Sequence, residues 1–242
     1  MPVTRPNTPS RGTSMPASSG VSIVRPSDRV VTAHAAGRFI TLEGGEGAGK
    51  STQIARLATW LQDRGRTVVA TREPGGSPGA EMIRKLLVEG PVERWDGTTE
   101  ALLHFAARRE HLRSTVWPAL ARGDWVISDR FADSTMAYQG YGHGLGREVF
   151  EKLYALAVGD FRPDLTIVLD LPVETGLARA AARRGTETRY ESLPQAFHEQ
   201  VRAGFREIAA REPRRCVVVD ATRSIEAIAD SIVEAVRDRL AA

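Results

Sequence analysis

Five short apolar runs recur along the chain, and a longer segment with helical periodicity follows each of them. The runs are rich in Val, Ile and Leu and mostly do not alternate with polar residues, which is typical of parallel strands covered on both faces. The predicted strands are 39–42, 67–71, 125–128, 165–171 and 216–220. The predicted helices are 50–64, 79–88, 98–122, 147–159, 173–184, 193–211 and 224–240. This alternation predicts an α/β domain with a doubly wound, five-stranded parallel sheet and helices on both faces.

Residues 1–37 have a different composition from the rest of the chain. They are rich in Pro, Ser, Thr, Gly and Arg and show no periodicity. Such a segment buries too little apolar surface to offset the entropy lost on ordering. We therefore expect a disordered N-terminal extension over 1–37 and one folded domain over 38–242. A basic nucleic-acid arm and an organelle-targeting peptide are the alternatives for the extension, and Met15 leaves a later translation start open.

The net charge of +3 is concentrated in the extension. Residues 1–38 hold five arginines and one aspartate, which leaves a charge of −1 for residues 39–242. The folded part thus lacks the basic excess of a nucleic-acid-binding domain. No apolar run approaches the roughly 20 residues that span a bilayer. A single cysteine, Cys216, excludes an internal disulfide framework. We expect a cytoplasmic protein with neither a membrane nor a nucleic-acid partner.

A glycine-rich segment directly follows the first predicted strand. It fits the phosphate-loop pattern G-x-x-x-x-G-K-[ST] at every fixed position, and the alternative is a glycine-rich turn without a ligand. Backbone N–H groups of such a loop, together with the start of the next helix, surround phosphate oxygens. The predicted ATP-binding residues are Gly44, Gly45, Glu46, Gly47, Ala48, Gly49, Lys50, Ser51 and Thr52. Lys50 would reach the outer phosphates, and the Ser51 hydroxyl would bind Mg²⁺.

Two more polar segments follow strands of the predicted sheet, at the edge where ligands bind in such folds. Residues 71–76 read Thr-Arg-Glu-Pro-Gly-Gly, and an exposed turn with a surface ion pair is the alternative there. Asp129 and Arg130 close the third strand, before a loop that carries Ser134, Thr135, Tyr138 and Gln139. A carboxylate at this position can hold Mg²⁺, directly or through water. The adjacent arginine can clamp a second phosphate.

Two arginine-containing segments complete the candidate site. On the helix predicted for 98–122, Phe105 shares a face with Arg108 or Arg109, since residues three or four apart are neighbours. Such a pair could stack on a base and donate to its carbonyl edge, although a core phenylalanine with a solvated arginine fits the spacing equally. Residues 179–191 contain several arginines around Gly185 and predict a lid over transferring phosphates. A solvated helix end is the alternative.

Taken in order, these segments resemble the thymidylate kinase family. The resemblance rests on Gly-Gly-Glu-Gly-Ala-Gly-Lys-Ser-Thr, Thr-Arg-Glu-Pro-Gly-Gly, Asp-Arg-Phe-x-x-Ser-Thr-x-Ala-Tyr-Gln and Arg-Tyr-Glu, and it runs from about residue 38 to the C-terminus. It implies a P-loop NTPase-type nucleoside monophosphate kinase, of the bacterial branch with a basic lid. Such an enzyme uses ATP and Mg²⁺ to phosphorylate dTMP to dTDP for dTTP synthesis, and it is a homodimer. A kinase for another nucleoside monophosphate and a nucleotide-gated binding module are the alternatives.

The resemblance also implies a role for each matching position. The catalytic residues would be Lys50, Glu46, Arg130, Arg183 and Arg184. The dTMP site would be formed by Arg72, Glu73, Pro74, Arg84, Phe105, Arg108, Arg130, Thr135, Tyr138 and Gln139. Ser51 and Asp129 would bind the metal ion. Within this set, Phe105 would stack on thymine and Arg108 would donate to its O4.

The chain departs from the family pattern at two points. The family aromatic usually lies four residues before its arginine, which pairs Phe105 with Arg109. The downstream spacing to His111 instead aligns Arg108 and leaves His104 at the aromatic position, so both arginines stay candidates for the thymine contact. The lid often ends in Asp-Arg-x-Glu, and here Thr188 stands where that aspartate would be.

Overall fold

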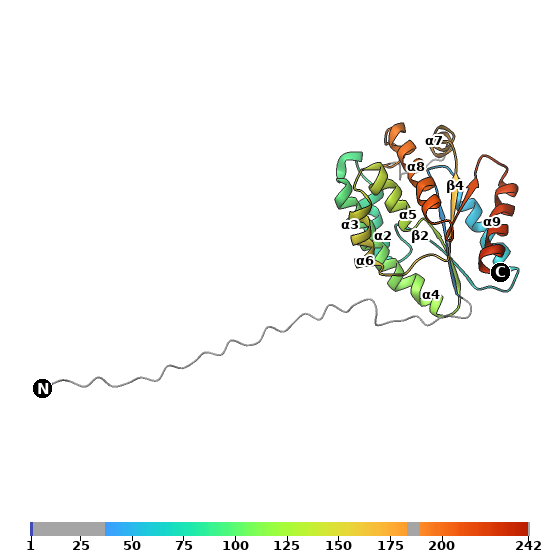
Figure 1. The fold of residues 1–242 in the computed structure, drawn as a ribbon, viewed down its shortest axis with the longest axis horizontal. Coiled ribbons are helices and arrows are strands. Elements are labelled where there is room, and N and C mark those ends of the chain that lie inside the picture. The colour runs from blue at the N-terminus through green and yellow to red at the C-terminus, as the bar shows by residue number, and fades with distance from the viewer. Residues whose placement is uncertain (2–36, 183–188, 242) are drawn as a thin grey trace. The chain divides into compact units, whose positions relative to one another are not determined.

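A computed structural model describes Met1 and residues 37–182 and 189–241 of the protein. Its centre is one sheet of five parallel strands in the order β2-β3-β1-β4-β5 (Figure 1). The strands are β1 (Arg38–Glu43), β2 (Val68–Arg72), β3 (Trp125–Asp129), β4 (Leu165–Asp170) and β5 (Cys216–Asp220). The predicted doubly wound, five-stranded parallel sheet is confirmed. The extension predicted over 1–37 lies almost wholly outside the described residues.

Helices connect the strands and agree closely with the predicted ones. They are α1 (Lys50–Gln62), α2 (Pro78–Val88), α3 (Gly97–His111), α4 (Trp117–Ala121), α5 (Ala132–Thr135), α6 (Arg147–Ala157), α7 (Val173–Ala181), α8 (Gln195–Arg211) and α9 (Ile225–Leu240). Two π-helical segments, Leu112–Val116 and Met136–Gly142, continue α3 and α5. The prediction of a loop after Arg130 is therefore wrong, because this stretch is helical. Several of its buried side chains are polar, so the sequence lacks the apolar periodicity that indicates a buried helix face.

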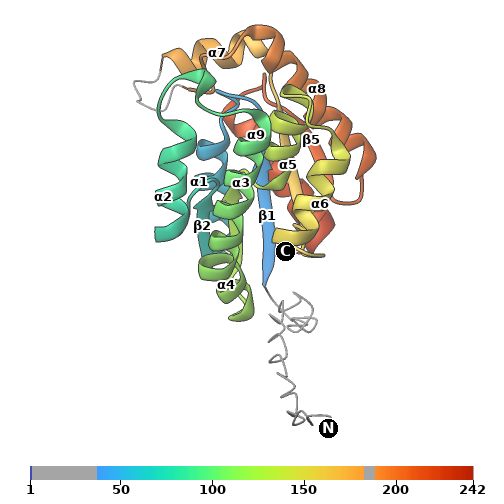
Figure 2. The same cartoon turned by 90° about the vertical axis from the view of Figure 1, so that its left-hand side faces the viewer.

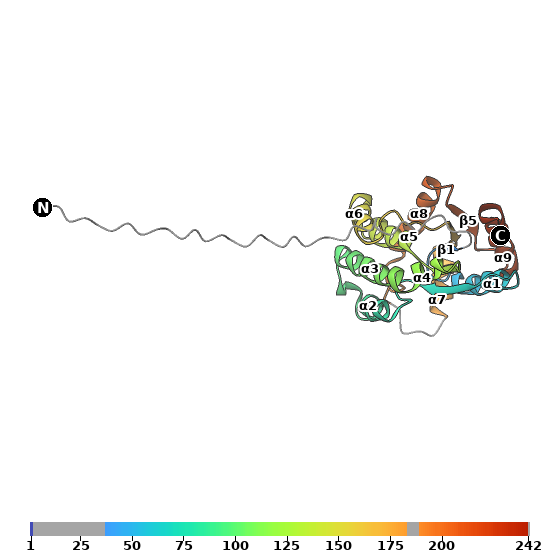
Figure 3. The same ribbon diagram turned by 90° about the horizontal axis from the view of Figure 1, so that it is seen from below.

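Side chains of each strand alternate between two apolar cores, one on each face of the sheet. On β1, Phe39 belongs to one core and Ile40 to the other. Helices α1 and α9 cover the Ile40 face, and α3, α6 and α8 cover the Phe39 face (Figures 1 and 3). The free thiol of Cys216 is buried in the core that contains Phe39. Burial of both faces explains why the strands lack alternation in the sequence.

Because all five strands run in the same direction, the loops that follow them gather at one edge of the sheet. Helix α7 lies at that end of the domain, the end toward which β1 runs (Figure 2). The phosphate loop, the segment after β2 and the segment after β3 all leave the sheet there, which fixes where a site can form. Among the described residues, no helix is both long enough and apolar enough to cross a bilayer.

Candidate active site at the carboxyl edge of the sheet

A cavity of about 540 Å³ opens beside the ends of β1, β2 and β3. It joins the two halves that the sequence predicts, a phosphate loop and an acceptor pocket. The predicted residues that line it are Glu46, Gly47, Ala48, Gly49, Lys50, Ser51, Arg72, Glu73, Pro74, Arg84, Asp129, Arg130 and Tyr138. The other lining residues include His104, Ser134 and Tyr190. Thr52, in contrast, is an exposed residue of the first turn of α1.

The phosphate loop turns directly into the N-terminus of α1. Gly49 precedes the helix with φ 90°, a left-handed conformation that glycine adopts at little cost, and no side chain caps the helix. The first N–H groups of α1 are thus available to an anion. The Lys50 ammonium group donates to the carbonyl oxygens of Gly44 at 3.2 Å and Gly45 at 3.0 Å. Burial lowers the pKa of Lys50, and Arg130 nearby lowers it further.

The phosphate loop also packs tightly against α7. A Cβ atom added to Gly47 would lie 2.1 Å from the carbonyl oxygen of Gly176. A Cβ atom added to Gly176 would lie 2.4 Å from the carbonyl oxygen of Glu46. The two backbones approach this closely only because both positions are glycine.

Arg130 and Glu46 form the centre of the cavity wall. The Arg130 guanidinium donates to Glu46 Oε1 at 2.9 Å, to Ser134 Oγ at 3.0 Å and to the hydroxyl oxygen of Tyr138 at 3.1 Å. It also donates to the Gly44 carbonyl oxygen at 3.0 Å. Burial by itself would raise the pKa of Glu46, but Arg130 and Lys50 outweigh it and lower that pKa to about 2. Arg130 has a backbone φ of 68°, a strained value for a residue with a side chain.

Ser51 and Asp129 meet on the phosphate-loop side of the cavity. The Ser51 hydroxyl donates to Asp129 Oδ2 at 3.1 Å, and both residues line the cavity. A hydroxyl and a carboxylate are the hard oxygen ligands that Mg²⁺ takes in phosphoryl-transfer sites. The described residues contain no cluster of three or more His, Cys, Asp or Glu side chains arranged for a metal ion.

Glu73 anchors the opposite wall of the cavity. One carboxylate oxygen accepts from Arg108 Nε at 2.7 Å, and the other pairs with His111 Nδ1 at 2.9 Å. Burial opposes ionisation of Glu73, but Arg108 and His111 lower its pKa overall. Next to it, Arg84 donates to the Pro74 carbonyl oxygen at 2.7 Å. Arg72 is exposed at the rim and pairs with Glu81 at 3.1 Å.

The structure separates the two arginines that the sequence left as alternatives. Arg108 is fully buried beside the cavity, where its guanidinium donates to Glu73 and to Thr135 Oγ1 at 3.0 Å. Its Nη1 is buried and has no hydrogen-bond partner within the described residues. Arg109 is exposed on the other side of α3, with its guanidinium 4.9 Å from the Trp117 ring centroid. Of the two, Arg108 lies next to the cavity, because its ion-pair partner Glu73 lines the wall, although Arg108 itself does not.

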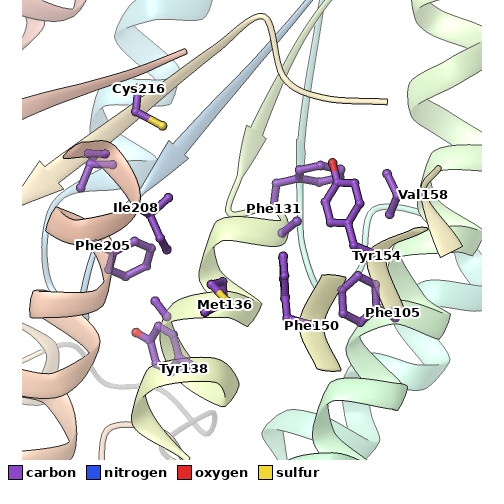
Figure 4. Close-up of a cluster of buried hydrophobic side chains, with 14 of the residues drawn as sticks. Phe105, Phe131, Met136, Tyr138, Phe150, Tyr154, Val158, Phe205, Ile208 and Cys216 are labelled. Carbon is purple, nitrogen blue, oxygen red and sulfur yellow. The ribbon is translucent and has the colours of Figure 1, made fainter. Parts of the chain in front are cut away.

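Phe105 lies in the apolar core and not in the wall of this cavity. Its ring packs against Phe150, with centroids 5.6 Å apart, and against Tyr154 at 6.3 Å. In Figure 4, Phe105 lies with these two rings of α6, and Phe131 and Met136 stand between this group and Tyr138. The expectation that Phe105 faces the base is therefore corrected: its neighbour His104 lines the cavity and contacts the hydroxyl of Tyr190 at 3.1 Å. Burial, helped by Arg108, lowers the pKa of His104 to about 3, so its ring is neutral.

Gln139 is buried one position beyond Tyr138. Its Nε2 donates to Glu100 Oε2 at 3.0 Å, and its Oε1 has no hydrogen-bond partner within the described residues. Glu100 also pairs with Arg189, whose guanidinium donates to the carbonyl oxygens of Leu87 in α2 and of Pro91 and Val92 in the segment after it. Arg189 is thus a buried anchor rather than a phosphate-facing lid residue. Of the other predicted lid positions, Arg179 is an exposed residue of α7, whereas Arg183, Arg184 and Thr188 lie outside the described residues.

Two further cavity residues had a signal in the sequence. His104 lies four residues before Arg108, the spacing typical of the family aromatic, and Ser134 belongs to the polar segment after Arg130. Glu100 has no such signal, because its importance comes from contacts with residues far along the chain.

A second carboxyl group that sequence reasoning missed lies directly behind the site. Glu43, at the end of β1, accepts from the Phe131 N–H at 2.7 Å and from the Ser134 hydroxyl at 2.5 Å. It is fully buried. Burial, reinforced by the charge of Asp133, raises the pKa of Glu43 to about 7. Glu43 therefore changes its charge near neutral pH. Ser134 links it to the cavity wall, because this hydroxyl donates to Glu43 and accepts from Arg130.

This chain is similar to known proteins over most of its length. A family model described as thymidylate kinase matches residues 42–232. Thymidylate kinases of Caulobacter vibrioides and Rhodopseudomonas palustris are 54% and 55% identical to this chain. The matched regions cover 84% of this chain in both cases, and 98% and 90% of the two relatives. The crystal structure of thymidylate kinase from Ehrlichia chaffeensis matches with a TM-score of 0.67 and 33% identity, over 84% of this chain and 99% of that one. The chain therefore belongs to the thymidylate kinase family.

Proposed function

We propose that this protein transfers the γ-phosphoryl group of ATP to dTMP, giving ADP and dTDP for dTTP synthesis in the cytoplasm. The observation that carries the proposal is that one cavity has the phosphate loop on one side and, on the other, Arg130 and the wall made by Arg72, Glu73 and Pro74. Two anionic substrates have to meet for this reaction. A cavity with cationic groups on both sides brings them together.

ATP would bind through the phosphate loop. The uncapped N-terminus of α1 and Lys50 would hold its phosphates, and Ser51 with Asp129 would hold Mg²⁺. When bound, Mg²⁺ neutralises charge on the transferring phosphoryl group. Two protein side chains suit this ion, because Mg²⁺ at such sites takes its other ligands from water and substrate phosphates.

Two unpartnered buried atoms support thymine as the base of the acceptor. Thymine presents an acceptor at O4 and a donor at N3–H. Arg108 Nη1 is a donor without an acceptor, and Gln139 Oε1 is an acceptor without a donor. Leaving such buried groups unpaired is costly, so a base that completes both of them is favoured over one that does not. The neutral ring of His104 at the cavity wall could stack on this base.

The protein need not supply a nucleophile. An oxygen of the dTMP phosphate forms the new bond to the γ-phosphorus, while the bond from that phosphorus to the bridging oxygen of ADP breaks. Catalysis then rests on positioning and on charge neutralisation by Lys50 and Arg130. Arg183 and Arg184, in the predicted lid, would add positive charge over the transferring group.

We also propose that the enzyme is a homodimer. Exposed apolar side chains gather on α2, α3 and α6, which are neighbouring helices (Figure 3). They are Met82, Leu86, Leu102, Val149 and Leu156, with Leu156 76% exposed. Exposed large apolar side chains on adjoining helices favour association with a second copy.

A coupled assay of ADP formation tests the proposed reaction. The enzyme is supplied with ATP and Mg²⁺ and with dTMP, dUMP, dCMP or dGMP in turn, and we expect dTMP to give the highest kcat/KM. A preference for a different monophosphate would instead identify a kinase for that nucleotide. Slow ATP hydrolysis with no phosphorylation of any monophosphate would identify a nucleotide-gated binding module.

A further inference from the structure

Glu100 is a fully buried carboxylate that no step of the proposed reaction uses. Hydrogen-bond donors surround it. Arg189 pairs with Oε1, while Gln139 Nε2 lies 3.0 Å and the Tyr190 hydroxyl 3.4 Å from Oε2. The imidazole Nε2 of His143 lies 3.5 Å from the same oxygen. Because an arginine is always protonated in proteins, this environment keeps Glu100 ionised.

An ionised carboxylate can only accept hydrogen bonds. The side-chain amide of Gln139 therefore has to turn its NH₂ group toward Glu100. The opposite orientation would bring the amide oxygen against a carboxylate oxygen, with no proton between them. Glu100 thus fixes which end of the Gln139 amide remains free, and that end is the acceptor Oε1.

We propose that Glu100 is a positioning residue for base specificity: it holds the Gln139 amide so that only a base with a proton on N3 is accepted. The inference rests on the proposed function, since it concerns the base of the monophosphate acceptor. Thymine and uracil carry N3–H and satisfy Gln139 Oε1. Cytosine has a lone pair at N3, which would face the lone pairs of Oε1. A polar site of this kind rejects the unmatched base because buried groups are left unpaired.

The variant Glu100→Gln tests this role, because a neutral amide at position 100 can donate as well as accept. Gln139 could then turn over and offer its NH₂ group to cytosine. We expect the ratio of kcat/KM for dTMP to that for dCMP to narrow by roughly tenfold or more, the value of about one hydrogen bond. The ratio for dTMP to dUMP should stay the same, because those two bases share N3–H and differ only in the 5-methyl group.

A double-mutant cycle with Gln139→Leu tests whether Glu100 acts through that amide. Gln139→Leu should narrow the dTMP-to-dCMP ratio by itself, and adding Glu100→Gln should then cause no further change. Independent, additive effects of the two substitutions would overturn the proposal. So would a loss of activity that is equal for dTMP, dUMP and dCMP, which is the result of a purely structural role.

Glu100→Asp is the second variant in case Glu100→Gln does not fold. It keeps the charge that Arg189 pairs with but draws the carboxylate back by one methylene group. The same ratio should narrow, by a smaller factor, and an unchanged ratio would contradict the role of Glu100. Activity of the unmodified enzyme on dTMP is read in the same assay. If that activity is absent, the proposed function fails together with this inference, whereas unchanged ratios in an active enzyme reject the inference alone.

Discussion

Arg130 and Tyr138 donate hydrogen bonds to the same carboxylate oxygen of Glu46, at 2.9 and 2.8 Å. The three side chains come from the phosphate loop, from the residue after β3 and from the π-helical segment that follows. Glu46 thus balances the charge of a half-buried arginine. The contact links the phosphate loop directly to the side of the cavity where the acceptor would bind.

Replacing Arg130 by Ala should impair the use of dTMP far more than the binding of ATP. The substitution removes the guanidinium proposed to bind the acceptor phosphate, and we expect kcat/KM for dTMP to fall by roughly 10³-fold or more. Steady-state kinetics and the Kd of a non-hydrolysable ATP analogue give the two numbers. An equal loss of kcat/KM for dTMP and of affinity for the ATP analogue would assign Arg130 to the ATP side of the cavity. Arg130→Gly is the matched variant: it should be as inactive but more stable than Arg130→Ala by about 1 kcal/mol, because glycine relieves the positive φ.

Replacing Lys50 by Ala should abolish turnover while the protein stays folded. The ammonium group of Lys50 contacts only backbone carbonyl oxygens within the described residues, so its removal breaks no ion pair. We expect kcat to fall by at least about 10²–10³-fold, as for loss of a single charge-stabilising group. Circular dichroism and thermal unfolding check the fold. Lys152→Ala on α6, which removes an exposed lysine, is the control and should keep full activity; full activity of Lys50→Ala would reject the ATP-site assignment.

Substitutions of the neighbours Phe105 and His104 should affect different properties, the first the stability of the fold and the second the KM for dTMP. Phe105→Ala leaves a cavity among Phe150 and Tyr154 and should lower the free energy of unfolding by roughly 3–5 kcal/mol, with little change in the KM for dTMP. His104→Ala should raise that KM, because its ring lines the cavity. Chemical denaturation and kinetics on both variants test the pair. If Phe105→Ala raised the KM and His104→Ala did not, the orientation of α3 described above would be wrong.

The free energy of unfolding should depend on pH through the ionisation of Glu43. Its pKa is about 7 in the folded state against 4.5 as a free side chain, so the folded state binds the extra proton between these values. The free energy of unfolding therefore falls as the pH rises from about 4.5 through about 7. Glu43→Gln mimics the protonated form. It should match the normal protein near pH 4.5 and exceed its stability at pH 8 by on the order of 1–3 kcal/mol. Parallel curves for the two proteins between pH 4.5 and 8 would show that Glu43 titrates normally.

A charge on the exposed apolar face of α2, α3 and α6 should dissociate the proposed dimer. Leu156→Asp introduces a carboxylate at its most exposed apolar position and should shift the molecular mass in solution toward that of one chain, about 26.4 kDa. Sedimentation or light scattering measures the mass. Ile225→Asp is the control, since that exposed residue begins α9 on the other face of the sheet. A single-chain mass for the normal protein would reject the dimer outright.

The sheet and most helices could be predicted because burial and periodicity determine them locally. Strand β3 is an apolar run that ends in Asp129, and α9 begins after Ser224, whose side chain caps it. Glycine and lysine at fixed offsets made the phosphate loop equally readable. These features depend on neighbours along the chain, which is the information that a single sequence contains.

The side of the cavity where dTMP is proposed to bind could be predicted only in part, because its geometry depends on contacts between distant segments. Phe105 and His104 are adjacent in the sequence, and only the rotation of α3 decides that the histidine faces the cavity. The helix over Ala132–Gly142 was missed because it buries Ser134, Thr135 and Gln139 against polar partners instead of apolar ones. Glu100 is unremarkable in the sequence, since its partners Gln139 and Arg189 lie 39 and 89 positions away.

The close approach of Gly47 and Gly176 extends the proposed ATP site to a position that does not line the cavity. A methyl group at 176 would press on the Glu46 carbonyl and reshape the phosphate loop from behind. Variation on α7 would then alter ATP use with every loop residue intact. Searches for resistance mutations, or for ways to retune nucleotide affinity, should therefore treat position 176 as part of the phosphate-binding apparatus.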